Sequence, residues 1–220
     1  MPAQKTHNYG NPHIGLFARA SDRLAVADIS ASPKFLSSLE QLRVPVVKAT
    51  FGGSGLAGIF ASLNSNGVIV PPSCSREEIA LFKSHGLNVA AIPGQFSAAG
   101  NNIAANDSGA VANPEMPRAV LKRISDCLGV EAVPMRVAGH VTSGSCVIAT
   151  NRGFAAHNRC TEQELKELQS ILGVPGSNCT LNAGVAAVSI GAVANSNGAL
   201  FGESSTGFEV GRAAGALGLE

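Results

Sequence analysis

The turn Asn64-Ser65-Asn66-Gly67 recurs along the chain, and its copies decide the fold. The later copies are Asn106-Asp107-Ser108-Gly109, Thr150-Asn151-Arg152-Gly153 and Asn195-Ser196-Asn197-Gly198. Successive final glycines are 42, 44 and 45 residues apart, and a polar stretch 44 residues before Gly67, Ala20-Ser21-Asp22-Arg23, is a degenerate first copy. A fixed period of this length is typical of repeat architectures. The 220 residues therefore accommodate five repeats of about 44 residues each.

Each turn lies between two stretches with strand character. Short apolar runs such as Val68-Ile69-Val70 and Ala110-Val111-Ala112 follow the turns. The stretches before the turns combine small and β-branched residues, as in Gly58-Ile59-Phe60-Ala61, Asn102-Ile103-Ala104-Ala105 and Cys146-Val147-Ile148-Ala149. Because Asn and Gly supply the positive φ angles that tight hairpin turns need, each copy predicts a β-hairpin.

A helix is expected after each hairpin. Ser75 with Glu78, and Thr161 with Glu164, have the spacing of capping boxes, and Pro117 suits the first turn of a helix through Leu128. Glycines that can adopt the left-handed C-cap conformation end these helices at Gly86, Gly129, Gly173 and Gly218. Further extended segments, such as 44–51 and 130–137, follow. The repeated unit is therefore strand, strand, helix, strand.

The two ends of the chain are expected to share the fifth unit. The fifth copy ends at Glu220, directly after its helix, and lacks its last strand. Residues 4–9 precede the first hairpin and belong to no unit. The simplest prediction is that this N-terminal strand completes the fifth unit and closes a ring, because closure removes exposed sheet edges.

The composition narrows the class of protein. There are 16 Lys and Arg against 15 Asp and Glu, and 45% of residues are hydrophobic. This balance disfavours a disordered tail and a strong general nucleic-acid binder. The five cysteines are odd in number and include no Cys-x-x-Cys pair, which favours reduced thiols over disulfides or a zinc ribbon. The absence of a signal-peptide pattern and of a long apolar run predicts a soluble, cytoplasmic protein without a membrane span.

Several motifs together resemble the translation initiation factor 6 family in its archaeal form, over the whole chain. They are Pro12-His13-Ile14-Gly15, Gly52-Gly53-Ser54-Gly55-Leu56-Ala57-Gly58, Asn64–Pro71, Ser97-Ala98-Ala99-Gly100-Asn101, Asn113-Pro114-Glu115 and Gly202–Glu209. The resemblance implies an α/β pentein fold, a five-bladed propeller with pseudo-fivefold symmetry, as one domain spanning residues 1–220.

The resemblance also implies a role and partners. Members of this family bind the intersubunit face of the large ribosomal subunit and sterically block the small subunit. Their implied contacts are the large-subunit protein numbered fourteen and the sarcin–ricin loop region of the rRNA. Release is linked to the Shwachman–Bodian–Diamond protein and an elongation-factor-like GTPase, and a role in large-subunit maturation is also implied. We expect a monomer that is not an enzyme and needs no cofactor.

Candidate contact residues follow from the repeat and the resemblance together. Glycines in the first four copies occupy equivalent positions, nine residues before the turn glycine in three of them: Gly15, Gly58, Gly100 and Gly144. One interpretation is that they only permit close backbone approach near the pseudo-fivefold axis. The resemblance implies that the positions around them face the ribosome, and the residues that follow the glycines are Leu16, Ile59, Asn101 and Ser145. The turn residues Asn64, Asn106 and Asn195 are instead expected to make local hydrogen bonds.

Other patterns point to chemistry less strongly. Residues 53–58 match the G-x-G-x-x-G dinucleotide fingerprint, but a strand rather than a helix is expected to follow. A local basic patch could touch rRNA phosphate, with Arg118, Lys122, Arg123, Arg152 and Arg159 as candidates.

Two alternative functions remain at this point. Pentein enzymes that act on amidino groups need a nucleophilic Cys, a His and paired acids, and neither His157 with Cys160 nor His140 with Cys146 has a recognisable acidic partner. We therefore expect no catalytic residues and no metal site. The other alternative is a scaffold module that does not bind ribosomes.

Overall fold

The computed structural model describes residues 3–219, which contain five three-stranded sheets. Met1, Pro2 and Glu220, the ends of the predicted domain and of its fifth unit, lie outside the described residues. The first strands of the sheets are β2 (Ala18–Ala20), β5 (Ser62–Leu63), β8 (Ile103–Ala105), β11 (Val147–Ala149) and β14 (Ala192–Asn195). The second strands are β3 (Ala25–Asp28), β6 (Gly67–Val70), β9 (Ala110–Ala112), β12 (Phe154–His157) and β15 (Gly198–Gly202). The third strands are β4 (Val46–Ala49), β7 (Asn88–Ala91), β10 (Ala132–Pro134), β13 (Gly176–Cys179) and β1 (Ala3–Thr6).

All five sheets have the same topology. The first two strands form an antiparallel hairpin, and the third strand is parallel to the second. A parallel connection needs a crossover, which in the first four sheets is a helix. The outer helices are α1 (Pro33–Leu39), α3 (Arg76–Ser84), α5 (Arg118–Leu128), α7 (Glu162–Leu172) and α9 (Gly207–Ala216), with the 3-10 turn η2 (Glu40–Leu42) extending α1.

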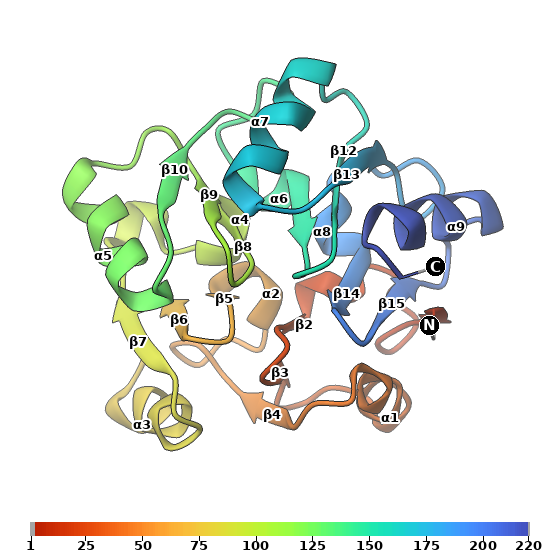
Figure 1. Cartoon of the computed structure of the whole chain (residues 1–220). Helices are drawn as coiled ribbons and strands as arrows, with labels where there is room; N and C mark the ends of the chain where they lie inside the picture. Colours follow the sequence, from red (N-terminus) through yellow and green to blue (C-terminus); the bar gives the residue numbers. More distant parts are fainter. Residues whose placement is uncertain (1–2, 220) are drawn as a thin grey trace.

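The units succeed one another around a common centre, with these helices outermost (Figure 1). We number the units 1 to 5, beginning with β2, β5, β8, β11 and β14, and call the line through the centre of Figure 1 the axis. A second set of short helical segments precedes the first strands. These are η1 (Ile14–Leu16), α2 (Ala57–Phe60), α4 (Ala99–Asn102), α6 (Ser143–Cys146) and α8 (Val188–Gly191); a further 3-10 turn, η3 (Gly94–Phe96), lies before α4.

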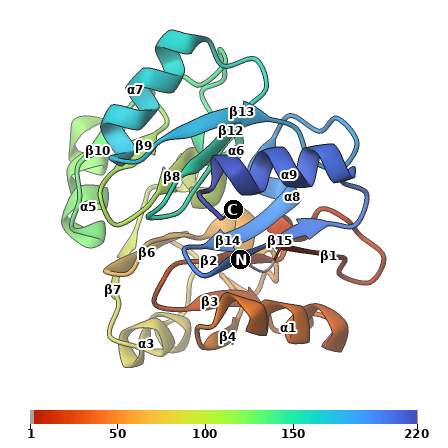
Figure 2. The ribbon, with the colours of Figure 1, turned by 45° about the vertical axis from the view of Figure 1, so that its right-hand side comes forward.

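The N-terminal strand β1 completes the fifth sheet, as predicted. It pairs in parallel with β15, in a register that sets Ala3 opposite Ala199 and Thr6 opposite Gly202. Figure 2 shows β1 beside β15, on the side of unit 5 that adjoins unit 1. The fifth sheet is therefore built from both ends of the chain.

The core is divided into five clusters, one between each pair of neighbouring units. In β6, for example, Val68 and Val70 join a cluster shared with unit 1, whereas Ile69 joins a cluster shared with unit 3. The last cluster joins Leu200 of unit 5 to Phe35 of unit 1. Because successive side chains of a strand point to opposite faces, a central strand that is buried on both faces must be apolar throughout.

The turns differ from the prediction in one respect. None of the turn glycines, which are Gly67, Gly109, Gly153 and Gly198, has a positive φ. The positions need glycine because of a neighbour: a Cβ added at Gly67 would lie within 3.0 Å of the carbonyl of Cys127, at the end of α5 in the next unit. Equivalent additions at Gly109 and Gly153 would meet the carbonyls of Ile171 and Ala216.

Two boundaries also need correction. The stretch 58–61 contains no strand residue, because it ends α2 and precedes β5, whereas 102–105 and 146–149 each begin with the last residue of a short helix, α4 or α6, and continue as a strand. The first copy of the turn is Ser21–Leu24 rather than 20–23, since the Ser21 N–H donates to the carbonyl of Leu24 as the Asn64 N–H does to that of Gly67. The left-handed C-caps were predicted correctly at Gly86, Gly129, Gly173 and Gly218.

Candidate interaction face

The five short helical segments meet at one end of the axis, which we call the short-helix end. Each segment contacts the next in sequence order, and α8 contacts η1. The opposite end, which we call the turn end, carries the five hairpin turns, because the first strands run from the short helices to the turns. The second and third strands run back, so the residues that follow them lie at the short-helix end.

The predicted glycines form the contacts between the short helices. A Cβ at Gly58 would lie within 3.0 Å of the carbonyl of Gly15, and one at Gly100 would meet the carbonyl of Gly58 in the same way. Gly144 stands in this relation to Gly100, and Gly15 to Ser189. Backbone therefore approaches backbone from unit to unit. The fifth position, Ser189, was missed because it is not glycine, although it also lies nine residues before a turn glycine.

Arg19 joins several of these carbonyls from inside the axis. Its Nε donates to the Gly58 carbonyl at 3.1 Å, its Nη1 to the Ser189 carbonyl at 2.9 Å, and its Nη2 to the Gly100 carbonyl at 3.4 Å. Among residues 3–219 it has no carboxylate within ion-pair distance. Burial lowers the pKa of Arg19 to about 10, so the guanidinium stays charged at neutral pH. It also lines an axial cavity of about 40 Å³.

We call Gly15, Gly58, Gly100, Gly144 and Ser189 the ring positions. The residues that directly follow them are half-buried and surround the axis. They are Leu16, Ile59, Asn101, Ser145 and, in the fifth unit, Ile190. The Ser145 hydroxyl donates to the Thr142 carbonyl at 2.7 Å. The Asn101 backbone N–H donates to the Ala98 carbonyl at 3.0 Å, whereas its side-chain amide has no hydrogen-bond partner within residues 3–219 and is available to a ligand. The structure thus brings the predicted residues together at one end, and it adds Ile190.

Exposed apolar side chains also lie at this end of the molecule. Tyr9 is 72% exposed and Phe208 76% exposed, and Ile29 and Leu56 are also exposed. Tyr9, Ile29 and Phe208 follow β1, β3 and β15, and Leu56 directly precedes α2, so all four lie at the short-helix end. Large apolar side chains left exposed on the same end as the unpartnered Asn101 side chain are consistent with a surface that contacts protein.

Three capping-box glutamates shape the rim of the same end. Beyond the two predicted boxes, Thr206 and Glu209 form a third at the start of α9. The Glu209 carboxylate also accepts hydrogen bonds from the backbone N–H groups of Ala183 and Gly184, at 3.1 and 2.8 Å. Burial raises the pKa of Glu209, but the hydrogen bonds outweigh it and lower this pKa to about 2. Glu78 and Glu164 hold the turns at 52–53 and at 138 in the same way.

The turn end is tied together by side-chain amides. The local bonds predicted for Asn64 are present, since its Oδ1 accepts from the N–H groups of Asn66 and Gly67. Its Nδ2 also donates to the carbonyls of Asn106 and Leu128 in the next unit, at 3.1 and 2.9 Å. Asn106 and Asn195 make the same pair of contacts to the units that follow them. These contacts between units were not predicted.

The comparisons with known proteins agree with this repeat. The family model for the eIF-6 family matches residues 3–216. The chain belongs to the eIF-6 family. It is 38% identical over 211 residues to translation initiation factor 6 of Methanosphaerula palustris, covering 96% of this chain and 95% of that protein. It is likewise 38% identical to that of Methanobrevibacter smithii, with 95% and 94% covered, and 34% identical to that of Haloquadratum walsbyi, with 95% and 93% covered.

The thiols of this eIF-6 family chain are poorly suited to nucleophilic catalysis. Burial raises the pKa of Cys74 and Cys160 to about 12 and that of Cys127 and Cys179 to about 11. Burial also raises the pKa of Cys146. A nucleophilic cysteine needs the opposite shift, because the thiolate is the reactive form. The relatives are named as translation initiation factors rather than as enzymes.

The remaining motifs do not form sites in the part of the chain that is described. The last two residues of the glycine fingerprint at 53–58 begin α2, a helix of one turn that was not predicted, and the expected strand follows as β5. A Cβ at Gly55 would meet the carboxylate of Asp28, so an anionic ligand is disfavoured there. No group of three or more His, Cys, Asp and Glu within residues 3–219 could hold a metal ion. Over the same residues, no helix has the length and apolar character to cross a membrane.

Proposed function

We propose that this protein binds the intersubunit face of the large ribosomal subunit through its short-helix end and thereby excludes the small subunit. Family membership supports the role in translation. The observation that carries the choice of surface is the ring of half-buried residues around the axis, with the unpartnered Asn101 amide and the exposed apolar side chains beside it. We further propose that the fold is a closed pentein propeller forming one domain.

The proposed mechanism is steric. A rigid surface loses little conformational freedom on binding, and backbone-to-backbone contacts through Gly58 and Gly100 restrict movement at this end. A contact of about 800 Å² on each partner is enough for a specific, reversible complex. The proposed partners are the large-subunit protein numbered fourteen and the nearby sarcin–ricin loop region. Release by the Shwachman–Bodian–Diamond protein and a GTPase, a role in large-subunit maturation, a monomeric state and a cytoplasmic location belong to the same proposal.

Sucrose-gradient sedimentation with purified ribosomal subunits tests this function. We expect the protein to migrate with the large subunit only and to reduce the amount of joined ribosomes. Migration at the top of the gradient would overturn the proposal and leave a scaffold that does not bind ribosomes. Mild alkylation of the native protein tests the enzyme alternative, which needs one hyper-reactive thiol.

The substitution Asn101→Ser tests the surface. It shortens a half-buried side-chain amide that has no internal hydrogen bond, so we expect the melting temperature to stay within about 2 °C while large-subunit binding weakens about tenfold. Gln169→Ser, an exposed change near the C-terminal end of α7 and away from the short helices, is the matched control and should leave binding unchanged. Undiminished co-sedimentation of the Asn101 variant would contradict the assignment.

A further inference from the structure

A groove on the flank of the molecule lies between α3 of unit 2 and α5 of unit 3. It has a volume of about 800 Å³, and Gly86, Val89, Ala90 and Ala119 are among the small and apolar residues that line it. Its walls carry Lys83 from the end of α3 and Lys122 and Arg123 from α5. The groove runs along the flank: Gly86 lies near the turn end, where α3 ends and β7 begins, whereas Ala119 lies at the start of α5 and nearer the short-helix end.

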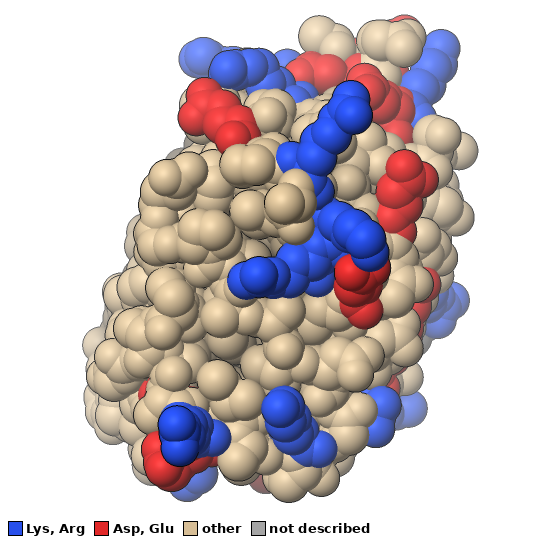
Figure 3. Space-filling view, turned by 90° about the vertical axis from the view of Figure 1, so that its left-hand side faces the viewer, with Lys and Arg blue, Asp and Glu red and all other residues tan. Residues whose placement is uncertain are grey.

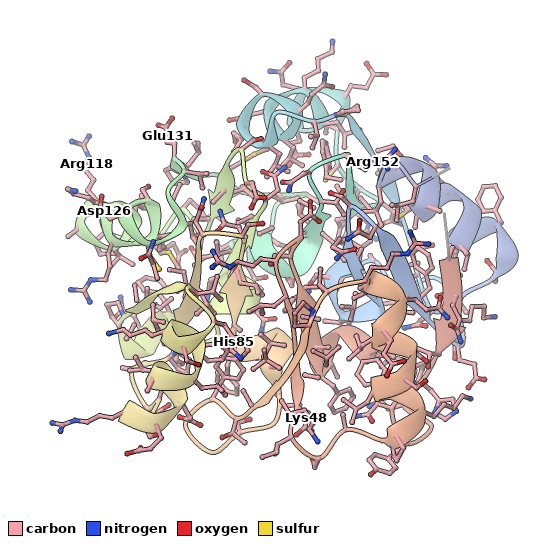
Figure 4. All side chains as sticks on the ribbon, turned by 60° about the horizontal axis from the view of Figure 1, so that its bottom comes forward. Lys48, His85, Arg118, Asp126, Glu131 and Arg152 are labelled. Carbon is pink, nitrogen blue, oxygen red and sulfur yellow. The ribbon has the colours of Figure 1, made fainter. Side chains whose placement is uncertain are left out.

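Basic side chains gather on this flank of the molecule, with acidic ones along its margin (Figure 3). Lys122 forms an ion pair with Asp126 at 2.8 Å, which leaves Lys83 and Arg123 as cations without a carboxylate partner among residues 3–219. Arg118, one turn before Lys122 on α5, points outward into solvent at the edge of the same flank (Figure 4). The positive charge is therefore available to an external anion.

The floor of the groove adds hydrogen-bonding groups. β7 is the edge strand of its sheet and pairs with β6 alone, so one side of its backbone has no partner strand. Arg123 Nη1 donates to the carbonyl of Ala91 at 3.0 Å, which holds the guanidinium beside this edge. Asn88, also in the lining, is exposed, and its Nδ2 donates to the Cys127 carbonyl at 3.3 Å. Oriented guanidinium groups and backbone N–H groups are the donors that phosphate oxygens accept best.

We propose that this groove binds the phosphate backbone of ribosomal RNA, as a second contact beside the short-helix end. The choice of ribosomal RNA rests on the proposed function, whereas the placement of the cations does not. No aromatic residue is in the groove lining, so base stacking is not expected, and recognition is of the backbone and independent of sequence. The other basic candidates do not join it: Arg152 lies in the hairpin turn of unit 4, far from Arg118 in Figure 4, and Arg159 follows β12 in the same unit.

The test compares the wild type with Lys83→Glu/Arg123→Glu. The control, Lys48→Glu/Lys166→Glu, makes the same charge change at exposed lysines of units 1 and 4. The probe is large-subunit rRNA freed of protein, with affinity measured by filter binding between 50 and 200 mM KCl. Three phosphate contacts predict a roughly 40-fold loss of wild-type affinity over this range. We expect the groove variant to bind at least tenfold more weakly at 50 mM, with a salt slope smaller by about 2, and the control to match the wild type.

Two results would overturn the proposal. One is equal affinity and slope in the wild type and the groove variant, and the other is an equal loss in the control. Binding of a polyglutamate peptide is measured as well. If the peptide binds the wild type more tightly than rRNA does, and the groove variant no longer binds the peptide, the groove binds an acidic protein segment instead of rRNA. Failure of the wild type to sediment with large subunits contradicts the proposed function, whereas the rRNA measurement still decides the groove.

Discussion

The two ends of the axis hold the same five units together by opposite means. At the turn end, the amides of Asn64, Asn106 and Asn195 each donate to two carbonyls of the following unit. At the short-helix end, glycines let backbone meet backbone, and the one cation of Arg19 bonds to carbonyls of three units. The units are therefore joined at the turn end by asparagine side chains, and at the short-helix end mainly by backbone contacts that the lack of a side chain on glycine permits.

This difference affects what each end can do for a partner. The turn amides are buried and use their donors within the molecule. Beside the ring glycines the Ser145 hydroxyl donates to the Thr142 carbonyl, but the Asn101 side-chain amide has no partner in the described chain. Close backbone contact therefore fixes the short-helix end without consuming the side chains that stand on it, which suits a binding surface.

The largest effect is expected from Gly58→Ala. The added methyl group would overlap the backbone carbonyl of Gly15, which belongs to the neighbouring unit and cannot move as a side chain can. We expect a loss of roughly 3 kcal/mol or more in the free energy of unfolding, measured by urea denaturation. Gly211→Ala, at an exposed position of α9 with no atom within 4 Å of the new group, should instead gain about 0.5–1 kcal/mol. Equal effects at the two glycines would break the comparison.

Asn106→Ala tests the turn end and ranks next. The change removes four hydrogen bonds: two that Nδ2 donates to the carbonyls of Thr150 and Leu172, both at 2.9 Å, and two that Oδ1 accepts from N–H groups of the same turn. It leaves buried carbonyls without donors. A loss of about 2–3 kcal/mol is expected in the same urea assay. Ser108→Ala, an exposed change in the same turn, should stay within about 0.5 kcal/mol. A cost below about 1 kcal/mol at Asn106 would mean that the amides do not hold the units together.

Acid should affect the short-helix end first. The pKa of Glu209 is about 2 in the folded protein, below the usual value of about 4.3. Its stabilisation is therefore complete above about pH 4.5 and is lost as the pH falls toward 2. Glu209→Gln should lower the free energy of unfolding on the order of 2 kcal/mol at pH 7 and reduce its decline between pH 4.5 and 2. Part of the decline in unfolding free energy remains in the variant, because the pKa of Glu78 is also lowered. A pH profile identical to the wild type would show that the carboxylate does not stabilise the rim.

The repeat could be predicted because its signals are local. The turn spacing, the capping boxes at Ser75 and Thr161 and the C-cap glycines each depend on a few neighbouring residues. The extra strand at the N-terminus followed from counting the elements of each unit. The grouping of Gly15, Gly58, Gly100 and Gly144 followed from the same spacing and the resemblance.

The remaining features depend on contacts between units, which leave weak signals in one sequence. Gly67 looked like a turn residue, but its constraint comes from Cys127, sixty residues later. Ser189 was not predicted because serine rather than glycine occupies this position. Its hydroxyl accepts a hydrogen bond from Arg19. Arg19 itself was visible only as a charged residue between Ala18 and Ala20 in a short apolar strand. A single charge at such a position is the one sign that could have indicated an axial role.

The pairing of β1 with β15 also sets an order of events during synthesis. Ala3 leaves the ribosome first, yet its partner Ala199 is made nearly two hundred residues later. At about 5–20 residues per second, the first strand waits on the order of 10–40 s before the fifth sheet can form. Units 2, 3 and 4 can assemble in the meantime from sequential segments. The fifth sheet forms only after β15 has been made, so a nascent chain that stalls before this point leaves both an unpaired first strand and an open side on unit 1.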